Sequence, residues 1–467
     1  MSERPSPART AVVLGGSHTG MLAARALAGL ADRVLVVERD ELPVTPAPRK
    51  GLPQARHAHM LWSGGVRAME ELLPGITAAL LDAGARRAPV TTDMVALSAQ
   101  GWFRRWPESH HVLLAGRDLL DATVRARVLA DGTVEAAGGT EVLGLTGGAA
   151  AVTGVRTRDR AGRERTVEAD LVVDATGRGS GAPRWLAALG LPAPARREVD
   201  TGLAYASRLY LAPEQARADF PVVNVQPDPR DGGPGRAGFL LPIENGRWIV
   251  TLNGTRGGEP TSAAEDFVPF ARDRLRHPLI GDLLAQAEPL SDVAVTRATV
   301  NRRYFYERMP AWPDNFTVLG DALAAYNPVY GHGLAVGAQS ALLLRDLTRR
   351  YGLGTPGLSR RVQKAVARPV GAAWDLAIGQ DVFYPGATEN GPTARDRIVS
   401  AYVSRLMYTA TGNGRIARRV TDVTSLERRA EVLLAPSVLL AALAGPLKPA
   451  LTGPPLTAEE LKRAGLQ

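Results

Sequence analysis

The stretch Arg9–Asp40, RTAVVLGGSHTGMLAARALAGLADRVLVVERD, contains the pattern that decides the fold of this protein. It predicts an apolar strand at Ala11–Leu14, a tight glycine turn, an apolar helix over Met21–Leu30 and a second strand at Val34–Val37. Strand, turn, helix and strand in this order form the mononucleotide-binding half of a Rossmann unit, and a merely structural βαβ unit is the weaker alternative. We therefore expect an α/β fold built on a parallel sheet.

The turn has the groups that would bind the pyrophosphate of a dinucleotide. Gly15 and Gly16 permit a turn that is too tight for a Cβ atom, and Gly20 lets the helix pack close to the strand. The helix N-terminus then directs free N–H groups at the phosphates. Ser17 replaces the middle glycine of G-x-G-x-x-G, so it needs a tolerated backbone conformation there. Glu38, 18 residues after Gly20, is placed as a carboxylate that binds ribose hydroxyls.

Composition limits the classes of function. The 467 residues are 45% hydrophobic and 22% charged, which is enough for two or three packed globular units. The absence of cysteine excludes disulfides and thiolate sites, and it agrees with a cytoplasmic location. The net charge is +9, but basic and acidic residues are interspersed, so we expect no nucleic-acid partner. Residues 1–9 lack an apolar core and prolines break the apolar run at 432–447, so neither a signal peptide nor an integral membrane segment is expected.

The hydrophobic pattern changes along the chain and predicts an α/β (α+β) architecture of several parts. Short alternating segments in the middle of the chain predict a separate mixed sheet, and the last hundred or so residues are mostly helical in pattern. A further short strand is predicted at Gly101–Trp106. The predicted parts are a Rossmann-type dinucleotide-binding domain at 1–189, an inserted mixed-sheet domain at 190–311, the return of the first domain at 312–351 and a helical C-terminal region at 352–467. The resemblance described below implies that the first is an FAD-binding domain and the second a substrate domain.

Two pieces far downstream add to the glycine turn. Arg117 begins a predicted helix directly after a strand, and Asp321 follows a strand end, where a carboxylate can accept a ribityl hydroxyl. Pro328, Gly331 and Gly333 form a close-fitting loop whose backbone can approach a flat ring. The helix that follows favours partial negative charge at its N-terminus.

These motifs resemble those of the flavoprotein monooxygenases of the para-hydroxybenzoate hydroxylase type, and more closely those of squalene epoxidase. They are most similar to the FAD epoxidases of bacterial polyether-ionophore biosynthesis. The shared motifs are GGSHTG at 15–20, RKGLPQARHAH at 49–59 and GDALAAYNPVYGHG at 320–333, and the resemblance covers nearly the whole chain.

The resemblance implies FAD as cofactor and a role for each matching residue. Glu38, with Arg39 beside it, would hold the adenosine ribose, while Arg49 and Arg117 would bind at or near the pyrophosphate. Val142 would meet the adenine through its backbone. The residues expected to bind FAD are Gly15, Gly16, Ser17, Thr19, Gly20, Glu38, Arg39, Arg49, Gln54, Arg56, Arg117, Val142, Asp321, Pro328, Gly331, Gly333 and Leu334.

The resemblance also implies the chemistry. Reduced flavin would react with molecular oxygen to give a C4a-hydroperoxide, which would epoxidise alkenes of a hydrophobic, polyketide-derived polyene. No catalytic side chain and no metal ligand is expected, and Pro328, Gly331 and Gly333 are only candidates for lining the flavin ring. Thr176 stands where NAD(P)H-using relatives carry an aspartate, so both direct reduction by NAD(P)H and a separate flavin reductase stay open.

Other functions compatible with the motifs remain. An FAD-dependent aromatic hydroxylase would share the cofactor, a flavin reductase of isoprenoid chains would need no oxygen, and a flavin-binding sensor or carrier would not be an enzyme. A flavin halogenase is less favoured because the chain has no W-x-W-x-I-P stretch; Trp248 and Trp312 stand alone.

Overall fold

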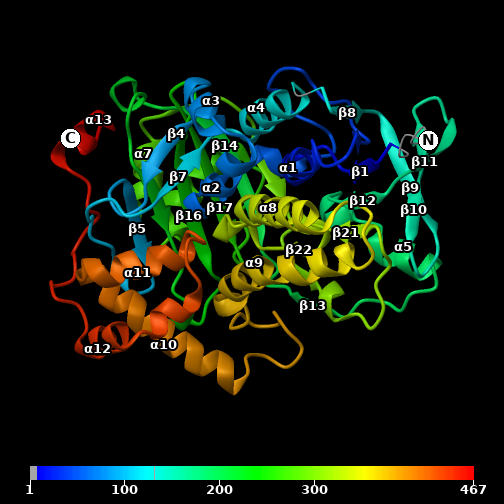
Figure 1. Ribbon diagram of the computed structural model, residues 1–467. Helices are drawn as coiled ribbons and strands as arrows, with labels where there is room; N and C mark the ends of the chain where they lie inside the picture. The colour runs from blue at the N-terminus through cyan, green and yellow to red at the C-terminus, as the bar shows by residue number, and fades with distance from the viewer. Residues whose placement is uncertain (1–7, 131, 467) are drawn as a thin grey trace, which may run out of the picture.

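The α/β fold class is confirmed by the computed structural model of the chain, which describes residues 8–130 and 132–466. A parallel sheet, a larger mixed sheet and a helical C-terminal region are its main parts (Figure 1). Residues 1–7, which belong to the segment considered above for a signal peptide, lie outside the described residues.

The parallel sheet contains the predicted Rossmann strands. Its five strands are ordered β21-β12-β1-β2-β8, and every neighbouring pair is parallel. The carboxyl ends of parallel strands meet at one edge, which brings the glycine turn, Glu38 and the segment after β21 to the same side of the sheet. The strands are β1 (Thr10–Leu14), β2 (Arg33–Val37), β8 (Val134–Ala137), β12 (Leu171–Asp174) and β21 (Phe316–Val318).

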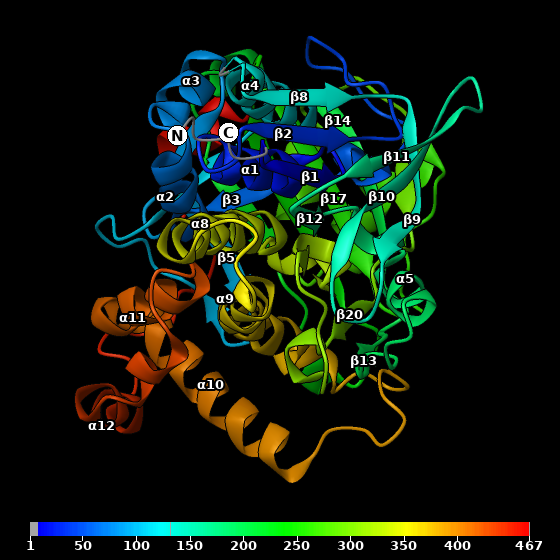
Figure 2. The same cartoon turned by 45° about the vertical axis from the view of Figure 1, so that its right-hand side comes forward.

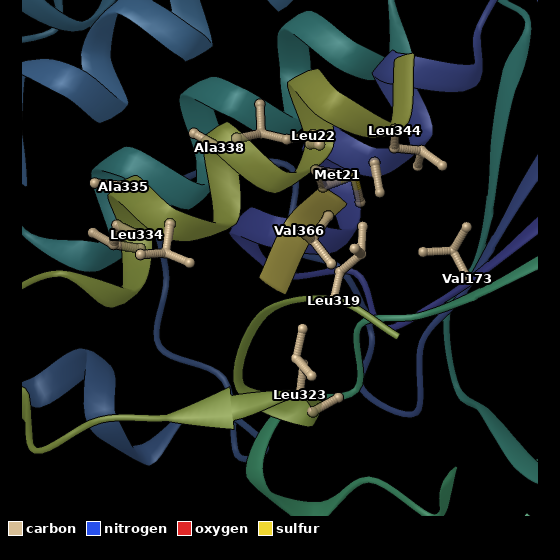
Figure 3. Packing of buried hydrophobic residues seen from close by; sticks show 14 of the residues in the cluster. Met21, Leu22, Val173, Leu319, Leu323, Leu334, Ala335, Ala338, Leu344 and Val366 are labelled. Carbon is tan, nitrogen blue, oxygen red and sulfur yellow. The ribbon is translucent and has the colours of Figure 1, made fainter. Parts of the chain in front are cut away.

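Helices α1 and α8 pack together beside this sheet and form its core. Figure 3 shows Met21 and Leu22 of α1 near α8, whose Ala338 and Leu344 point into the same apolar cluster. α1 ends at Leu27, earlier than predicted, because the chain turns at once into β2. The helices around the sheet are α1 (His18–Leu27), α4 (Arg117–Leu129), α8 (Gly333–Tyr351) and α9 (Leu358–Asp381).

The second large sheet has eight strands of mixed direction. Its strand β5 pairs in parallel with β15, so residues 94–102 contribute to a sheet otherwise formed by residues of the middle region. The strand predicted at Gly101–Trp106 ends at Trp102, because the N–H groups of Arg104 and Trp106 bind carbonyls outside the sheet. The strands are β5 (Met94–Ser98), β6 (Gly101–Trp102), β14 (Ala204–Leu211), β15 (Val222–Val225), β16 (Arg236–Ile243), β17 (Arg247–Gly254), β18 (Glu288–Pro289) and β19 (Ala294–Thr296).

Three smaller antiparallel sheets complete the strands. One contains β9 (Thr140–Gly147), β10 (Val152–Asp159) and β11 (Glu164–Glu168). The others combine β3 (Met60–Trp62), β7 (His111–Leu114) and β4 (Arg86–Pro89), and β13 (Arg196–Val199), β20 (Asn301–Tyr304) and β22 (Ala324–Ala325). The short helices are α2 (Ser63–Leu72), α3 (Ile76–Asp82), α5 (Ala182–Ala188), α6 (Ala264–Pro269) and α7 (Leu279–Leu284).

The last helices form a layer of their own at one end of the molecule, away from β9–β11 (Figures 1 and 2). They enclose a small core that is separate from the main one. Within residues 8–130 and 132–466, no helix combines the length and the apolar character needed to cross a membrane. The helices of this layer are α10 (Ala394–Gly412), α11 (Gly414–Thr424) and α12 (Pro436–Ala444). α13 (Ala458–Arg463) lies apart from them, and Ala464 just after it belongs to the core of the mixed sheet.

Candidate functional site

The glycine turn after β1 has the close approach that the sequence predicts. Gly15 has a φ of +98° and its N–H donates to the Val37 carbonyl oxygen at 2.8 Å. A Cβ atom on Gly20 would lie 1.8 Å from the Gly15 carbonyl oxygen, so only glycine allows α1 to begin so near the strand. Ser17 has a φ of −94° and a ψ of −174°, an extended conformation that serine adopts without strain. This is why serine can replace the middle glycine.

Glu38 is held against the turn by backbone donors. Its Oε2 accepts a hydrogen bond from the Gly16 N–H at 2.7 Å, and its Oε1 accepts one from the Asp40 N–H at 3.0 Å. The Arg49 Nη1 lies 3.4 Å from the same Oε2. Glu38 is buried, whereas Arg39 beside it is exposed. The carboxylate therefore has a fixed position at the end of β2.

Asp121 completes a buried charge cluster and was missed by the sequence analysis. Arg117 donates from Nε to Asp121 Oδ1 at 2.8 Å and from Nη2 to Ser17 Oγ at 2.8 Å, while Arg49 Nη2 lies 3.4 Å from Asp121 Oδ2. Burial raises the pKa of Asp121, but the charge and hydrogen bond of Arg117 outweigh it and hold that pKa below its usual range. The i, i+4 spacing of Arg117 and Asp121 on α4 was the available signal.

Buried His18 and half-buried His59 border this cluster in their neutral forms. His59 donates from Nδ1 to the His57 carbonyl oxygen at 2.8 Å, which leaves Nε2 to accept from Arg117 Nη1 at 3.4 Å. Burial and the Arg117 charge lower the pKa of His59 to about 3. His18 donates from Nε2 to the Leu334 carbonyl oxygen at 3.2 Å, and burial lowers its pKa to about 4. Neither histidine carries charge near neutral pH.

The segment after β21 meets the glycine turn at the N-terminus of α8. A Cβ on Gly333, the first residue of α8, would lie 3.7 Å from Asp321 Oδ1, so this half-buried carboxylate lies beside the helix end. Asp321 Oδ2 is 3.9 Å from Arg178 Nε. Thr19 of α1 packs so closely on α8 that a Cβ on Gly337 would be 2.3 Å from its Oγ1. The two helix N-termini are thus brought to one place.

Asp381, at the end of α9, holds the loop that precedes α8. Its Oδ2 accepts from Asn301 Nδ2 at 2.7 Å and Asn327 Nδ2 at 2.9 Å, and its Oδ1 accepts from the Tyr330 hydroxyl at 2.9 Å. The Tyr205 hydroxyl of the mixed sheet donates to Asn327 Oδ1 at 2.8 Å. Burial raises the pKa of Asp381. No local pattern in the sequence pointed to this residue.

The RKGLPQARHAH segment connects the nucleotide end to the mixed sheet. Gln54 and Arg56 are exposed on a short 3₁₀ turn, Pro53–Arg56. His57 Nδ1 then makes a 2.8 Å hydrogen bond with Ser207 Oγ on β14, and the following N–H of Ala58 donates to a threonine hydroxyl on β17 at 3.0 Å. The segment therefore spans the boundary between the two large sheets.

The structure brings most of the predicted residues to the edge where the parallel strands end. The glycine turn with Thr19, together with Glu38, Arg49, Arg117, Asp321, Gly333 and Leu334, lies there. Pro328 and Gly331 lie on the adjoining loop, which Asp381 anchors. Val142 lies apart on β9, half-buried, and Arg39, Gln54 and Arg56 are exposed at the periphery.

These residues fit FAD. The turn is a cradle that a Cβ would fill, two buried guanidinium groups stand beside a helix N-terminus, and a glycine-containing loop precedes a second helix. This combination is that of an FAD-binding fold. The chain matches the family described as FAD binding domain over residues 8–347, and it belongs to that family.

Comparison with known proteins agrees with this assignment. Protein Rv3254 of Mycobacterium tuberculosis is 32% identical over 410 residues, which cover 83% of this chain and 83% of that protein. The solved structure of the flavin-dependent brominase Bmp2 has a TM-score of 0.65 at 16% identity, covering 89% of this chain and 92% of that chain. p-Nitrophenol 4-monooxygenase PnpA of Pseudomonas putida has a TM-score of 0.61 at 16% identity, covering 90% and 99%. At these identities the solved structures show a shared fold.

Proposed function

We propose that this protein is an FAD-dependent monooxygenase that epoxidises alkenes of a hydrophobic, polyketide-derived polyene. The observation that carries the proposal is the hydrogen-bonded loop at 327–333. Asp381 binds its Asn327 and Tyr330, and Tyr205 of the mixed sheet binds Asn327 from the other side. A loop expected to line the flavin ring is thereby tied to the sheet expected to hold the substrate. The motif resemblance to polyether-type epoxidases supports the polyene as substrate.

The residues of the site would divide the binding of FAD between them. The N–H groups at the start of α1, with Arg117 and Arg49, would bind the pyrophosphate, and Glu38 would bind the ribose. Asp321, beside the N-terminus of α8, would accept a ribityl hydroxyl. Bound FAD, once reduced, would activate molecular oxygen, which supplies the oxygen atom that is transferred to the alkene.

The chain's own contribution to catalysis is to position the substrate and exclude water. His59 and Leu334, the latter on α8, are among the residues that line a small apolar pocket. Its other walls are Leu61, Leu80 and Leu113 with neighbouring small side chains. Transfer of oxygen to an alkene needs no protonated side chain, which agrees with the neutral histidines around the site.

Electrons would come from NAD(P)H, either directly or through a separate flavin reductase. Asp174 at the end of β12 is fully buried and accepts hydrogen bonds from the N–H and Oγ1 of Thr176 and from Ser180 Oγ. The N–H and the hydroxyl of Thr176 therefore both hold the turn after β12. Thr176 stands at the position where NAD(P)H-using relatives have an aspartate. Rates of NADPH oxidation by the FAD-loaded protein, measured with and without an added flavin reductase, distinguish the two routes.

Aromatic hydroxylation is the second candidate function. It is favoured by the shared fold with p-nitrophenol 4-monooxygenase and with the anhydrotetracycline hydroxylase OxyS of Streptomyces rimosus, which has a TM-score of 0.57 at 18% identity and covers 89% of this chain and 76% of that chain. Turnover of phenols with NADPH, without turnover of alkenes, would support this candidate over the epoxidase.

The decisive experiment incubates candidate polyenes with the FAD-loaded protein, a reductant and isotopically labelled oxygen gas, and analyses the products by mass spectrometry. We expect one labelled oxygen atom for each alkene that reacts. Labelled phenolic products would support the hydroxylase instead. A protein that keeps its flavin but forms no oxygenated product from either substrate class would be a non-catalytic flavin-binding protein, and one that cannot be loaded with FAD would contradict the proposal.

A further inference from the structure

Large exposed apolar side chains concentrate on the C-terminal helices. Leu440 and Leu443 of α12 are 67% and 76% exposed, and Leu447 just beyond the helix is 75% exposed. On the same helix Val438 and Ala442 are buried against the small core of this region. α12 therefore packs through one edge and presents its leucines to solvent at the outer rim of the molecule, as Figure 2 shows for the helix.

A hollow of about 460 Å³ lies between α11 and α12, and of the three exposed leucines Leu447 lines it. Apolar side chains, including Val438 and Leu447, form one part of its wall. The other part is cationic and contains four arginines: Arg415, Arg418, Arg419 and Arg428. A cationic wall opposite an apolar one is complementary to a molecule with an anionic head and a hydrocarbon chain.

The positive charge in the hollow is not neutralised by the protein. Asp422 is the one carboxylate among its lining residues, and it already binds Arg419 at 3.0 Å and His110 at 2.8 Å. Within the part of the chain that the structure describes, the guanidinium groups of Arg415, Arg418 and Arg428 have no hydrogen-bond or ion-pair partner. An anion bound between them would relieve their mutual repulsion.

The hollow is separate from the flavin site. No residue that lines it is among those expected to bind FAD. A hydrogen bond joins α11 to the flavin loop, since the Thr424 carbonyl oxygen accepts from His332 Nε2 at 2.9 Å. Among the other large apolar side chains, Val44 is 94% exposed, and Leu81 and Leu290 are 37% and 45% exposed, and none of the three lines this hollow.

We propose that the hollow between α11 and α12 binds the phosphate head group of an anionic phospholipid, whose acyl chains lie against the exposed leucines of α12. Planar guanidinium groups pair with phosphate oxygens through two parallel hydrogen bonds, which favours phosphate as the head group. The lipid could be a dispersed molecule or part of a bilayer surface, and both would use the same arginines and leucines. The proposal does not depend on the substrate of the flavin site.

The test measures binding of defined lipids to the FAD-loaded full-length protein. The probes are dihexanoyl phosphatidylglycerol below its micelle concentration, the phosphatidylcholine analogue, vesicles of phosphatidylcholine with phosphatidylglycerol, and vesicles of phosphatidylcholine alone. Binding of the dispersed probe by calorimetry identifies a single-lipid ligand, and binding only in vesicle flotation identifies a bilayer surface. Either result supports the proposal if the phosphatidylglycerol form binds at least about tenfold more tightly than the neutral form.

Matched variants test whether the hollow is responsible. The double variant Arg418→Gln, Arg428→Gln is expected to weaken phosphatidylglycerol binding at least about tenfold, because two head-group contacts are lost. The control Arg160→Gln, Arg165→Gln removes the same charge from the exposed β10–β11 hairpin and should leave binding unchanged. Leu440→Ser should also weaken binding, and its control Leu290→Ser should not.

Three results would overturn the proposal. The first is equal binding of the phosphatidylcholine and phosphatidylglycerol probes, and the second is binding that the arginine variants leave unchanged. The third is the absence of lipid binding together with a concentration-dependent dimer, seen by analytical ultracentrifugation, that Leu440→Ser dissociates. In that case a second copy of the chain, and not a lipid, covers the leucines.

Discussion

At the nucleotide end of the site, the turn Gly15–Gly20 joins a strand and a helix that are adjacent in the sequence, and Glu38 ends the next strand of the same βαβ unit. At the ring end, the loop at 327–333 depends on Asn301 of β20 and on Asp381 of α9, and these three segments are remote from one another along the chain. The first end is set by local backbone geometry, and the second by hydrogen bonds that exist only after the chain has folded.

The two ends also differ in charge. The nucleotide end contains two carboxylates and two guanidinium groups, all buried: Glu38, Asp121, Arg49 and Arg117. The ring end contains one buried carboxylate, Asp381, and neutral donors around it. At the nucleotide end, the two arginines can exchange their contacts with carboxylates for contacts with an anionic ligand. At the ring end, the hydrogen bonds to Asp381 fix the conformation of the loop at 327–333.

Gly20→Ala should disrupt the turn at the nucleotide end, and it should cause the largest loss of stability among the variants described here. The new Cβ would lie 1.8 Å from a backbone oxygen that cannot move without disrupting the turn. We expect a loss of about 3 kcal/mol in the free energy of unfolding, measured by denaturant titration, and loss of bound FAD absorbance. Gly379→Ala, on α9 with no atom near the added Cβ, is the control and should be neutral or slightly stabilising. Equal stability of the two variants would contradict the local argument.

Asp381→Asn should disrupt the hydrogen bonds that hold the loop at the ring end. The substituted amide cannot accept all the hydrogen bonds that Asn301, Asn327 and Tyr330 donate, so at least one buried donor loses its partner. We expect a loss of about 2 kcal/mol in unfolding free energy and an altered visible spectrum of bound flavin. Asp375→Asn, one turn and a half earlier on the exposed side of α9, should change neither. An unchanged flavin spectrum would show that Asp381 has no influence on the ring environment.

Arg117→Gln tests the nucleotide end alone, because it should lower the affinity of the protein for FAD. Glutamine cannot supply charge-assisted hydrogen bonds to a pyrophosphate, so the dissociation constant of FAD should rise about tenfold in fluorescence titrations. Arg127→Gln, on the exposed face of the same helix, is the matched control. If both variants bind FAD as the unsubstituted protein does, Arg117 has a structural role only.

Acid should destabilise both ends, because each contains a histidine whose pKa is lowered in the folded protein. The effect of each histidine should be smaller than the effects of the substitutions above. Burial and Arg117 lower the pKa of His59 to about 3, and burial lowers that of His332 at the ring end to about 4. Between pH 6.5 and those values the unfolded chain takes up protons that the folded chain does not, so stability falls as pH falls. Each histidine should contribute up to about 1.4 kcal/mol per pH unit in this window.

Thermal unfolding between pH 7 and pH 5 measures this dependence. His332→Gln should make the slope shallower at the ring end, and His59→Gln should do so at the nucleotide end. Burial is the main cause of both lowered pKa values, and both lie below pH 5, so Arg117→Gln should leave the slope between pH 7 and pH 5 unchanged. A slope that is the same in both histidine variants as in the unsubstituted protein would mean that other groups dominate the acid response.

The βαβ unit and the glycine-rich loops could be predicted because their requirements are local. A tight turn needs glycine, a buried parallel strand needs a continuous apolar run, and both are visible in a few consecutive residues. β5 could not be predicted in its sheet, because a short strand becomes recognisable only from its pairing with β15. Asp121 could have been found from its spacing to Arg117, whereas Asp381 could not.

The sequence by itself determined the fold class and the place of the glycine turn, since backbone conformation and apolar periodicity follow from neighbouring residues. Its motifs pointed to a flavoprotein family by resemblance. The tertiary structure alone decided which charges share a buried cluster, how Asp381 anchors the loop at 327–333 and that arginines and leucines border one hollow at α11 and α12. These features depend on contacts between remote segments, and only packing brings such segments within hydrogen-bond distance.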